Sequence, residues 1–164
     1  MFHRICEAVI RLNTGSRFKG SVSTTQKEGI LMENNCIFCK IANGEIPAAT
    51  VYEDEDFRAI LDLGPASKGP PLILPKKHAA NLFELPEETA KKVLPLAKKL
   101  GARLEEGLHA EGLNVVQNNG EAAGQTVMHF HVHLIPRYKN DTVDVKWAQG
   151  TLTEDDKKEI LGLF

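Results

Sequence analysis

The chain has little of what marks a nucleic-acid-binding, membrane or disulfide-rich protein. Its formal net charge is only −2, so no broad basic field is available for a nucleic-acid backbone. No apolar run reaches the ~20 residues that cross a bilayer. Three cysteines are too few, and odd in number, for a secreted disulfide scaffold. We expect a reducing, cytoplasmic protein without nucleic-acid or membrane partners, although a small anionic ligand would need only local donors.

The length of 164 residues, with 42% apolar residues, fits one globular domain between two less patterned ends. We expect a flexible N-terminal extension over 1–33, the domain over 34–147, and a tail with a short helix over 148–164. The extension is rich in Arg, Ser and Thr, which also fits a mitochondrial-type targeting segment. An organellar location is therefore the alternative to the cytoplasm. Met32 is an alternative start for the protein.

Hydrophobic patterning predicts an α+β fold with a five-stranded antiparallel sheet. Short runs typical of strands are TVYED (50–54), FRAILD (57–62), PLILP (71–75), LNVVQN (113–118) and MHFHVHLI (128–135). The connections within each group of strands are too short for the crossovers of a parallel sheet. We expect the helices to cover one face of this sheet.

One long helix is predicted between the third and fourth strands, from about Pro86 to Glu106. Apolar residues recur there at steps of three and four, which gives one apolar stripe. Pro86 suits the first helical position, whereas Pro95 lies inside the pattern and should kink the helix.

Two short helices are predicted near the ends of the patterned region. The segment 36–45 (CIFCKIANGE) should be capped by Asn34 or Asn35 and should stop at Gly44. The segment Thr153 to Leu161 reads as a short helix with Thr153 as its N-cap.

Three of the six histidines occupy alternate positions of the last predicted strand. Side chains alternate between the faces of a strand, so His129, His131 and His133 share one face and the apolar residues between them share the other. Neighbours on one face are ~6.6–6.8 Å apart, so all three cannot easily bind one zinc ion, although two might. The three imidazoles should therefore divide between different tasks. A purely structural row is the alternative, but histidine is not a typical residue of buried strand faces.

One task is metal binding with Cys36 and Cys39. A C-x-x-C pair on a helix places both thiols on one face, and tetrahedral zinc prefers thiolates together with imidazoles. His78 and one histidine of the row would complete four ligands. A redox C-x-x-C would need a thioredoxin-like βαβ context, which the pattern lacks. Two simply buried thiols remain the plainer alternative.

The other task is phosphate chemistry. A neutral imidazole is nucleophilic near pH 7 and becomes a leaving group once phosphorylated. The preceding segment 118–126 (NNGEAAGQT) can bring backbone N–H groups, Gln125 and Thr126 to a phosphate. It lacks the lysine and spacing of a P-loop.

These motifs together resemble the histidine triad (HIT) family. HFHVHLI resembles its motif of three histidines separated by apolar residues, and the chain follows the Hint-like branch from about Asn34 to Trp147. The other matching segments, in order, are CIFCKIANGEIP, VYEDEDFRAILDL, LILPKKHAANLFELP and GLNVVQNNGEAAGQT. The resemblance implies a homodimer whose two sheets join into one, with a purine nucleotide site in each subunit.

The resemblance also implies a reaction. His131 would attack the α-phosphate of the nucleotide substrate, an amine or phosphate would leave, and water would release AMP or GMP from the nucleotidyl-histidine. His133 would contact the phosphate, and Asn118, Gln125 and Thr126 would surround the phosphate and leaving group. A P–N substrate is favoured by the Hint-like match, with dinucleoside polyphosphates as the alternative.

Binding residues follow from the same resemblance. Asp62 would bind the ribose hydroxyls, although a plain turn residue would also fit there. The wall of the base pocket would be formed by Phe38, Ile41, Ile60 and Leu63. Trp147 would lie in the core or reach the partner's pocket.

For the metal, the resemblance implies a structural zinc ion and no organic cofactor. Its ligands would be Cys36, Cys39, His78 and His129. The first histidine of the row would thus hold metal, the second would attack, and the third would contact phosphate. Four protein ligands would leave no open position on the zinc ion.

The chain departs from the family at Pro70. The family usually has K-G-H-x-L before the third strand, and this chain has KGPPL. Proline has no titratable side chain and no backbone donor, so we predict slower turnover than in a relative with histidine there. A nucleotide-binding regulatory module with weakened catalysis is therefore one alternative function. A zinc-stabilised structural or partner-binding protein is another.

Overall fold

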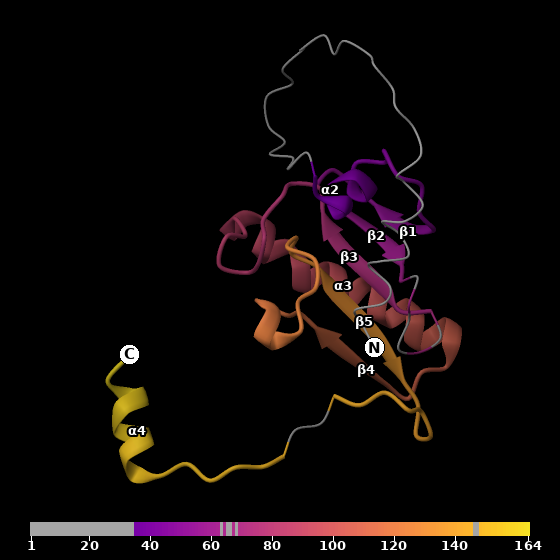
Figure 1. Ribbon diagram of the computed structural model, residues 1–164. Helices are drawn as coiled ribbons and strands as arrows, with labels where there is room; N and C mark the ends of the chain where they lie inside the picture. The colour runs from indigo at the N-terminus through magenta and orange to yellow at the C-terminus, as the bar shows by residue number, and fades with distance from the viewer. Residues whose placement is uncertain (1–34, 63, 65–66, 68, 146–147) are drawn as a thin grey trace.

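A five-stranded antiparallel sheet forms the centre of the protein (Figure 1). The computed structural model describes residues 35–62, 64, 67, 69–145 and 148–164. Expectations for residues 1–34, Leu63 and Trp147 lie outside these ranges. The strands, in the spatial order β1-β2-β3-β5-β4, are β1 Thr50–Glu53, β2 Phe57–Leu61, β3 Pro71–Pro75, β5 Val132–Arg137 and β4 Gly112–Val116. All four pairings are antiparallel, which confirms the predicted fold class.

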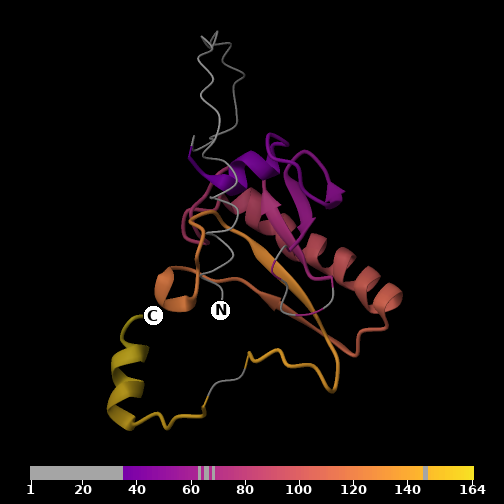
Figure 2. The same ribbon diagram turned by 45° about the vertical axis from the view of Figure 1, so that its right-hand side comes forward.

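The sheet carries a helix on each face (Figure 2). Helix α3 (Glu87–Leu108) packs on one face, and α2 (Ile37–Ala42) packs on the other. The expectation that the helices share one face is therefore wrong. Strand β3 explains the difference, because it is buried along its whole length. Its Ile73 packs in the cluster beneath α3, whereas Leu72 and Leu74 pack in the cluster beneath α2.

Helix α3 confirms the predicted long helix and its buried stripe of Val93, Leu96, Ala97 and Leu100. Pro86 is the N-cap and not the first helical residue, because its ψ of 137° is extended. The helix continues past Pro95 to Leu108, and His109 ends it with a left-handed φ of 53°.

The short helix α2 is capped by its own metal-ligand candidate. The Cys36 side chain accepts from the backbone N–H of Cys39, so neither Asn34 nor Asn35 is the cap. The predicted stop is close, since Asn43 is the C-cap and Gly44 follows with φ +81°. The sulfur atoms of Cys36 and Cys39 therefore both lie at the N-terminal end of α2.

The histidine row begins before its strand. Because β5 starts at Val132, His129 and His131 precede it, and His129 lies in the bend 127–129. The predicted alternation still holds, since Phe130, Val132 and Leu134 pack beneath α3. Residues 129–133 therefore turn their histidines toward the side of the sheet that carries α2.

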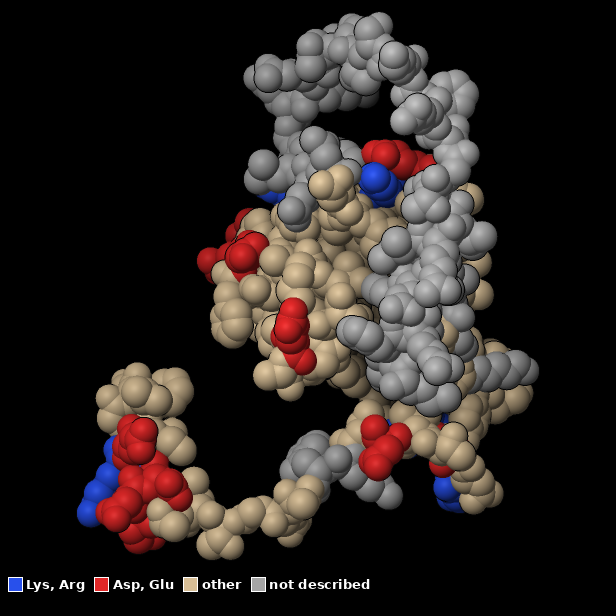
Figure 3. Space-filling view, in the orientation of Figure 1, with Lys and Arg blue, Asp and Glu red and all other residues tan. Residues whose placement is uncertain are grey.

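After β5 the chain leaves the sheet. Arg137 binds both carboxylate oxygens of Asp141, with Nε and Nη2 each at 2.8 Å. These bonds fix the turn that follows β5. Helix α4 (Glu154–Leu161) confirms the predicted terminal helix, and Thr153 caps it in a capping box. None of its residues is buried, and Figure 3 shows acidic side chains gathered on its surface. Among the described residues, no helix has the length and apolar character of a membrane span.

Candidate functional site

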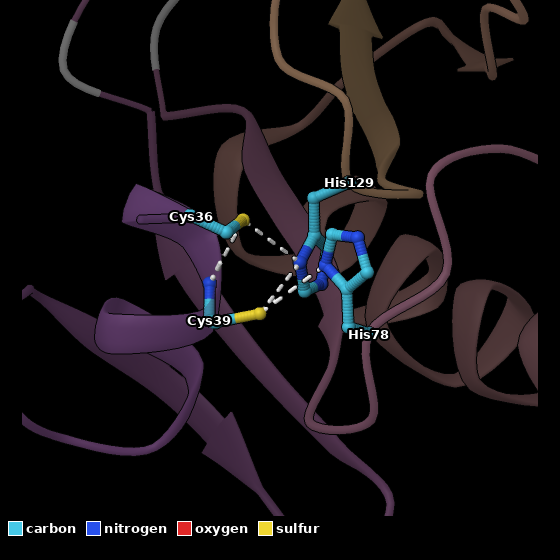
Figure 4. Close-up of side chains that lie close together, drawn as sticks. All are labelled: Cys36, Cys39, His78 and His129. Carbon is cyan, nitrogen blue, oxygen red and sulfur yellow. Dashed lines mark hydrogen bonds between the residues drawn. The ribbon is translucent and has the colours of Figure 1, made fainter. Parts of the chain in front are cut away.

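Four side chains from three parts of the chain meet beside α2 (Figure 4). Cys36 and Cys39 come from α2, His78 from the loop after β3, and His129 from the segment before β5. Their ligand atoms lie within 4.8 Å of one another. The Nδ1 atom of His129 is 3.4 Å from the sulfur of Cys36 and 3.5 Å from that of Cys39. His78 Nδ1 is 3.3 Å from the Cys39 sulfur.

The chemistry of these donors fits a tetrahedral zinc ion. With Zn–S near ~2.3 Å and Zn–N near ~2.0 Å, the sulfur–nitrogen edge of a tetrahedron is ~3.5 Å, close to the observed separations. The other ring nitrogen of His129, Nε2, lies 2.9 Å from the carbonyl oxygen of Pro75. A carbonyl can only accept, so Nε2 carries the proton and Nδ1 keeps a lone pair for a metal. Burial lowers the pKa of His129 to about 4, which keeps the ring neutral.

His131 has a fixed proton arrangement. The residue is 5% exposed, and its Nδ1 atom lies 2.7 Å from the carbonyl oxygen of His129. Nδ1 must therefore donate, which leaves the Nε2 lone pair free to attack. Burial lowers the pKa of His131 below its ordinary value, so the neutral, nucleophilic form is favoured near pH 7.

His133 lies between the nucleophile candidate and a carboxylate. Its ring centroid is 5.1 Å from that of His131, and its Nδ1 atom is 3.8 Å from Oδ2 of Asp62. Burial, reinforced by His131, lowers the pKa of His133 to about 4 despite the opposing effect of Asp62. The backbone N–H of Asp62 donates to the Pro70 oxygen at 3.1 Å. Pro70 thus lies at the same end of the sheet as the row.

Phe38 lies between the metal cluster and the nucleophile candidate. Its ring stands edge-on to His131, with centroids 5.1 Å apart, and to His129 at 6.0 Å. Of the other base-pocket candidates, Ile41 and Ile60 belong to the cluster beneath α2. The structure therefore brings these three residues to the side of the sheet that carries the histidine row.

The Gly-rich loop closes largely on itself. Gly120 and Gly124 adopt φ values of +82° and +86°, which favour glycine, around the short 3₁₀ turn Glu121–Ala123. The backbone N–H groups of Ala123, Gly124 and Gln125 donate within the loop. Asn118 and Thr126 stand at its two ends, with Asn118 half-buried and Thr126 exposed. The side chain of Gln125 is only 2% exposed.

Sequence reasoning missed the backbone partners of the site. The carbonyl oxygens of Pro75 and His129 set the tautomers of two histidines. The Asn119 side chain accepts from the backbone N–H of Leu82 at 2.7 Å and links the Gly-rich loop to the loop after His78. Carbonyl positions carry no residue-specific signal, so only the fold reveals them.

Comparisons with known proteins show the family to which the chain belongs. The model of the HIT domain matches residues 43–140. Protein hit of Bacillus subtilis is 44% identical over 128 residues, covering 77% of this chain and 87% of that protein. Adenosine 5'-monophosphoramidase hnt1 of Schizosaccharomyces pombe is 39% identical over 127 residues, covering 77% and 92%. The chain therefore belongs to the histidine triad family.

A solved structure bears on the metal cluster. The Zn-bound histidine triad family protein of Mycobacterium smegmatis is 38% identical, with a TM-score of 0.64 over 71% of this chain and 84% of that one. A group that could hold a metal ion is thus present in this chain, and a similar fold carries zinc.

Proposed function

We propose that the protein is a nucleotide hydrolase or transferase that cleaves purine nucleoside 5'-phosphoramidates through a nucleotidyl-histidine on His131. The observation that carries the proposal is the bond between Nδ1 of His131 and the His129 carbonyl at 2.7 Å. It leaves one buried, neutral imidazole nitrogen with a free lone pair beside a Gly-rich loop. The fold alone would not support a function, because folds host many activities.

The reaction needs two displacements at phosphorus. In the first, the Nε2 lone pair of His131 forms an N–P bond while the P–N bond of the substrate breaks. Its electron pair goes to the leaving amine, which takes a proton from solvent. In the second, water attacks phosphorus, the N–P bond returns its pair to Nε2, and a proton leaves to solvent. The His129 carbonyl stabilises the cationic ring of the intermediate through the Nδ1 proton.

Substrate contacts divide along the histidine row. Asp62, 3.8 Å from His133, is proposed to bind the ribose hydroxyls, and Phe38 to lie against the base. His133, Asn118 and Thr126 would meet the phosphate. A relative named for adenosine 5'-monophosphoramidase activity supports a P–N bond as the one cleaved. A dinucleoside polyphosphate remains the alternative substrate.

We propose a structural zinc ion held by Cys36, Cys39, His78 and His129. The ion would fix the N-terminus of α2 against the segment before β5, and no step of the reaction would pass through it. Two thiolate ligands suit a reducing compartment, so the cytoplasm is part of the same proposal.

A homodimer is also proposed, with β4 as the strand through which two sheets join. Strand β4 is at an edge of the sheet and exposes Leu113 and Val115. Exposed apolar edge strands are usually covered in native proteins. An adjoining hollow between α3 and β4 is lined in part by Gly101, Ala102 and Ala110.

Pro70 favours a second candidate, a nucleotide-binding regulatory module with weak catalysis. The residue lies next to β3, and its oxygen accepts from Asp62. It offers no proton to a leaving group. Nucleotide binding without turnover would select this function.

The test is release of AMP from an adenosine 5'-phosphoramidate by the full chain. The natural protein is expected to release AMP, and His131→Ala to release none while it still binds AMP. Turnover that survives in His131→Ala contradicts the proposal. AMP binding without release by the natural protein supports the regulatory module.

A further inference from the structure

The Gln125 side chain makes three amide hydrogen bonds, all to backbone groups of the chain. Its Oε1 accepts from the backbone N–H of Gly120 at 2.8 Å. Its Nε2 donates to the carbonyl oxygens of Ala80 at 2.6 Å and Val127 at 3.0 Å. Because an amide nitrogen has two hydrogens, both of its donors are used. The orientation is determined by these partners, since a flipped amide would set its oxygen against two carbonyls.

These three partners belong to three segments of the site. Gly120 lies in the Gly-rich loop, Ala80 lies two residues after His78, and Val127 leads into the histidine row. The buried Gln125 side chain therefore joins the Gly-rich loop, the loop after His78 and the segment that leads into the histidine row. Few side chains of this size could replace it, because a shorter amide would not span the same three groups.

Two further hydrogen bonds join the same segments to one another. Phe130 donates its backbone N–H to the Ala79 oxygen at 2.7 Å. The Asn119 side chain accepts from Leu82 at 2.7 Å. Gln125, Phe130 and Ala79 are each only 2% exposed, so their bonds are little exposed to competition from water.

We propose that Gln125 is a positioning residue that holds the Gly-rich loop in place to receive the substrate phosphate, and that its side chain does not touch the substrate. The inference rests on the proposed function for the identity of the ligand. It differs from the expectation that Gln125 contacts the phosphate or leaving group directly. The loop side chains that remain to meet phosphate are Asn118 and Thr126.

The two roles differ in the ligand-free protein. A positioning residue orders the loops before any nucleotide arrives, whereas a contact residue acts only once the phosphate is present. Gln125→Met keeps the length and removes every amide hydrogen bond. Gln117→Met is the matched control, because the Gln117 amide bonds only to Asn118 and Asn119, its immediate neighbours.

The first measurement is amide hydrogen exchange of the full-length, ligand-free protein. We expect Gln125→Met to raise exchange in residues 79–81 and 118–127 and to leave α3 unchanged, whereas Gln117→Met leaves 79–81 unchanged. Leu82 is left out of the comparison, because its backbone N–H bonds to Asn119, which is itself a partner of Gln117. Unchanged exchange in Gln125→Met overturns the proposal. Equal effects of the two variants on 79–81 also overturn it, because the bridge to that loop would then not belong to Gln125.

The second measurement compares the binding of AMP and adenosine by titration. Gln125→Met is expected to weaken AMP binding by about 10-fold or more, a common effect of removing a residue that positions a binding group. It should change adenosine binding by less than about 2-fold. Equal weakening of both ligands indicates general loosening of the fold and overturns the proposal. Neither measurement needs turnover, so a failure of the phosphoramidase function would appear separately, as absent AMP release by the natural protein.

Discussion

The ring of Phe38 stands edge-on to the ring of His131, with centroids 5.1 Å apart and planes at 79°. Phe38 lies between Cys36 and Cys39 in the sequence, so the helix that presents two thiols to the metal cluster also packs against the nucleophile candidate. Edge-to-face aromatic contacts of this kind hold rings in defined orientations. The metal cluster and the reactive imidazole are therefore parts of one packed unit.

Removal of zinc should therefore change the surroundings of the His131 ring. Purified protein is expected to contain one zinc ion per chain, and chelation should loosen α2 and lower the thermal midpoint. The NMR signals of the His131 ring should shift, because the Phe38 ring loses its fixed position. His109→Asn is a control, because it removes a histidine that is the C-cap of α3 and is not one of the four ligands. This variant should retain the metal. A zinc content far below one per chain would contradict the assignment of the four ligands.

Restoring a histidine at position 70 should speed the reaction. Pro70→His is expected to raise kcat by up to about 10²-fold, the lower end of what a positioned acid or base supplies. Pro70→Ala removes the ring without adding an imidazole and should bring no gain. Steady-state AMP release by the three proteins decides the matter. A Pro70→His variant no faster than the natural chain would show that the proline does not limit proton transfer.

Two glycines of α3 offer a matched test of how β4 packs. A Cβ atom at Gly101 would meet the Cδ2 atom of Leu113 at 2.5 Å, whereas one at Gly107 meets nothing within 4 Å. Gly107→Ala should stabilise the protein by ~0.5 kcal/mol through helix propensity. Gly101→Ala should be less stable than Gly107→Ala by roughly 0.5–1 kcal/mol, because the exposed Leu113 side chain must leave its preferred rotamer. Urea unfolding measures both, and equal stabilities would refute the close approach of α3 and β4.

The contribution of the turn after β5 to stability should depend on pH. Hydrogen bonds from Arg137 hold the pKa of Asp141 well below the usual range. A carboxyl with a lowered folded-state pKa stabilises the protein above its unfolded pKa of ~3.9, and this contribution is lost as the pH falls below that value. Asp141→Asn should therefore lower the urea midpoint at neutral pH, with a difference that narrows below about pH 4. Asp155→Asn, on the exposed α4, should show no such difference, and a pH-independent effect of Asp141→Asn would contradict the account.

Much of the fold follows from patterns that the sequence displays directly. The strands, the long helix and the Thr153 cap were predictable because alternation, helical spacing and capping residues are local signals. The placement of α2 opposite α3 was not predicted. It depends on β3 being buried on both faces, and a five-residue apolar run does not say how many faces are covered.

The site was predictable in its members but not in its hydrogen bonding. The spacing of the histidines and the C-x-x-C pair indicated which side chains would gather, and the structure brings Cys36, Cys39, His78 and His129 together. The tautomer of His131 depends on a backbone carbonyl that only the bend before β5 presents. The network around Gln125 joins residues 45 positions apart, a separation at which local sequence carries no signal.

The central claim is that His131 becomes covalently nucleotidylated, and one experiment addresses it directly. The full chain is mixed with an adenosine 5'-phosphoramidate, denatured at neutral pH within the first turnover, and analysed by peptide mass spectrometry. The account predicts one adenylyl group on the peptide that contains His131, located on that residue by fragmentation and absent from His131→Ala. AMP release without any adduct, or an adduct on His129 or His133 in its place, would contradict it.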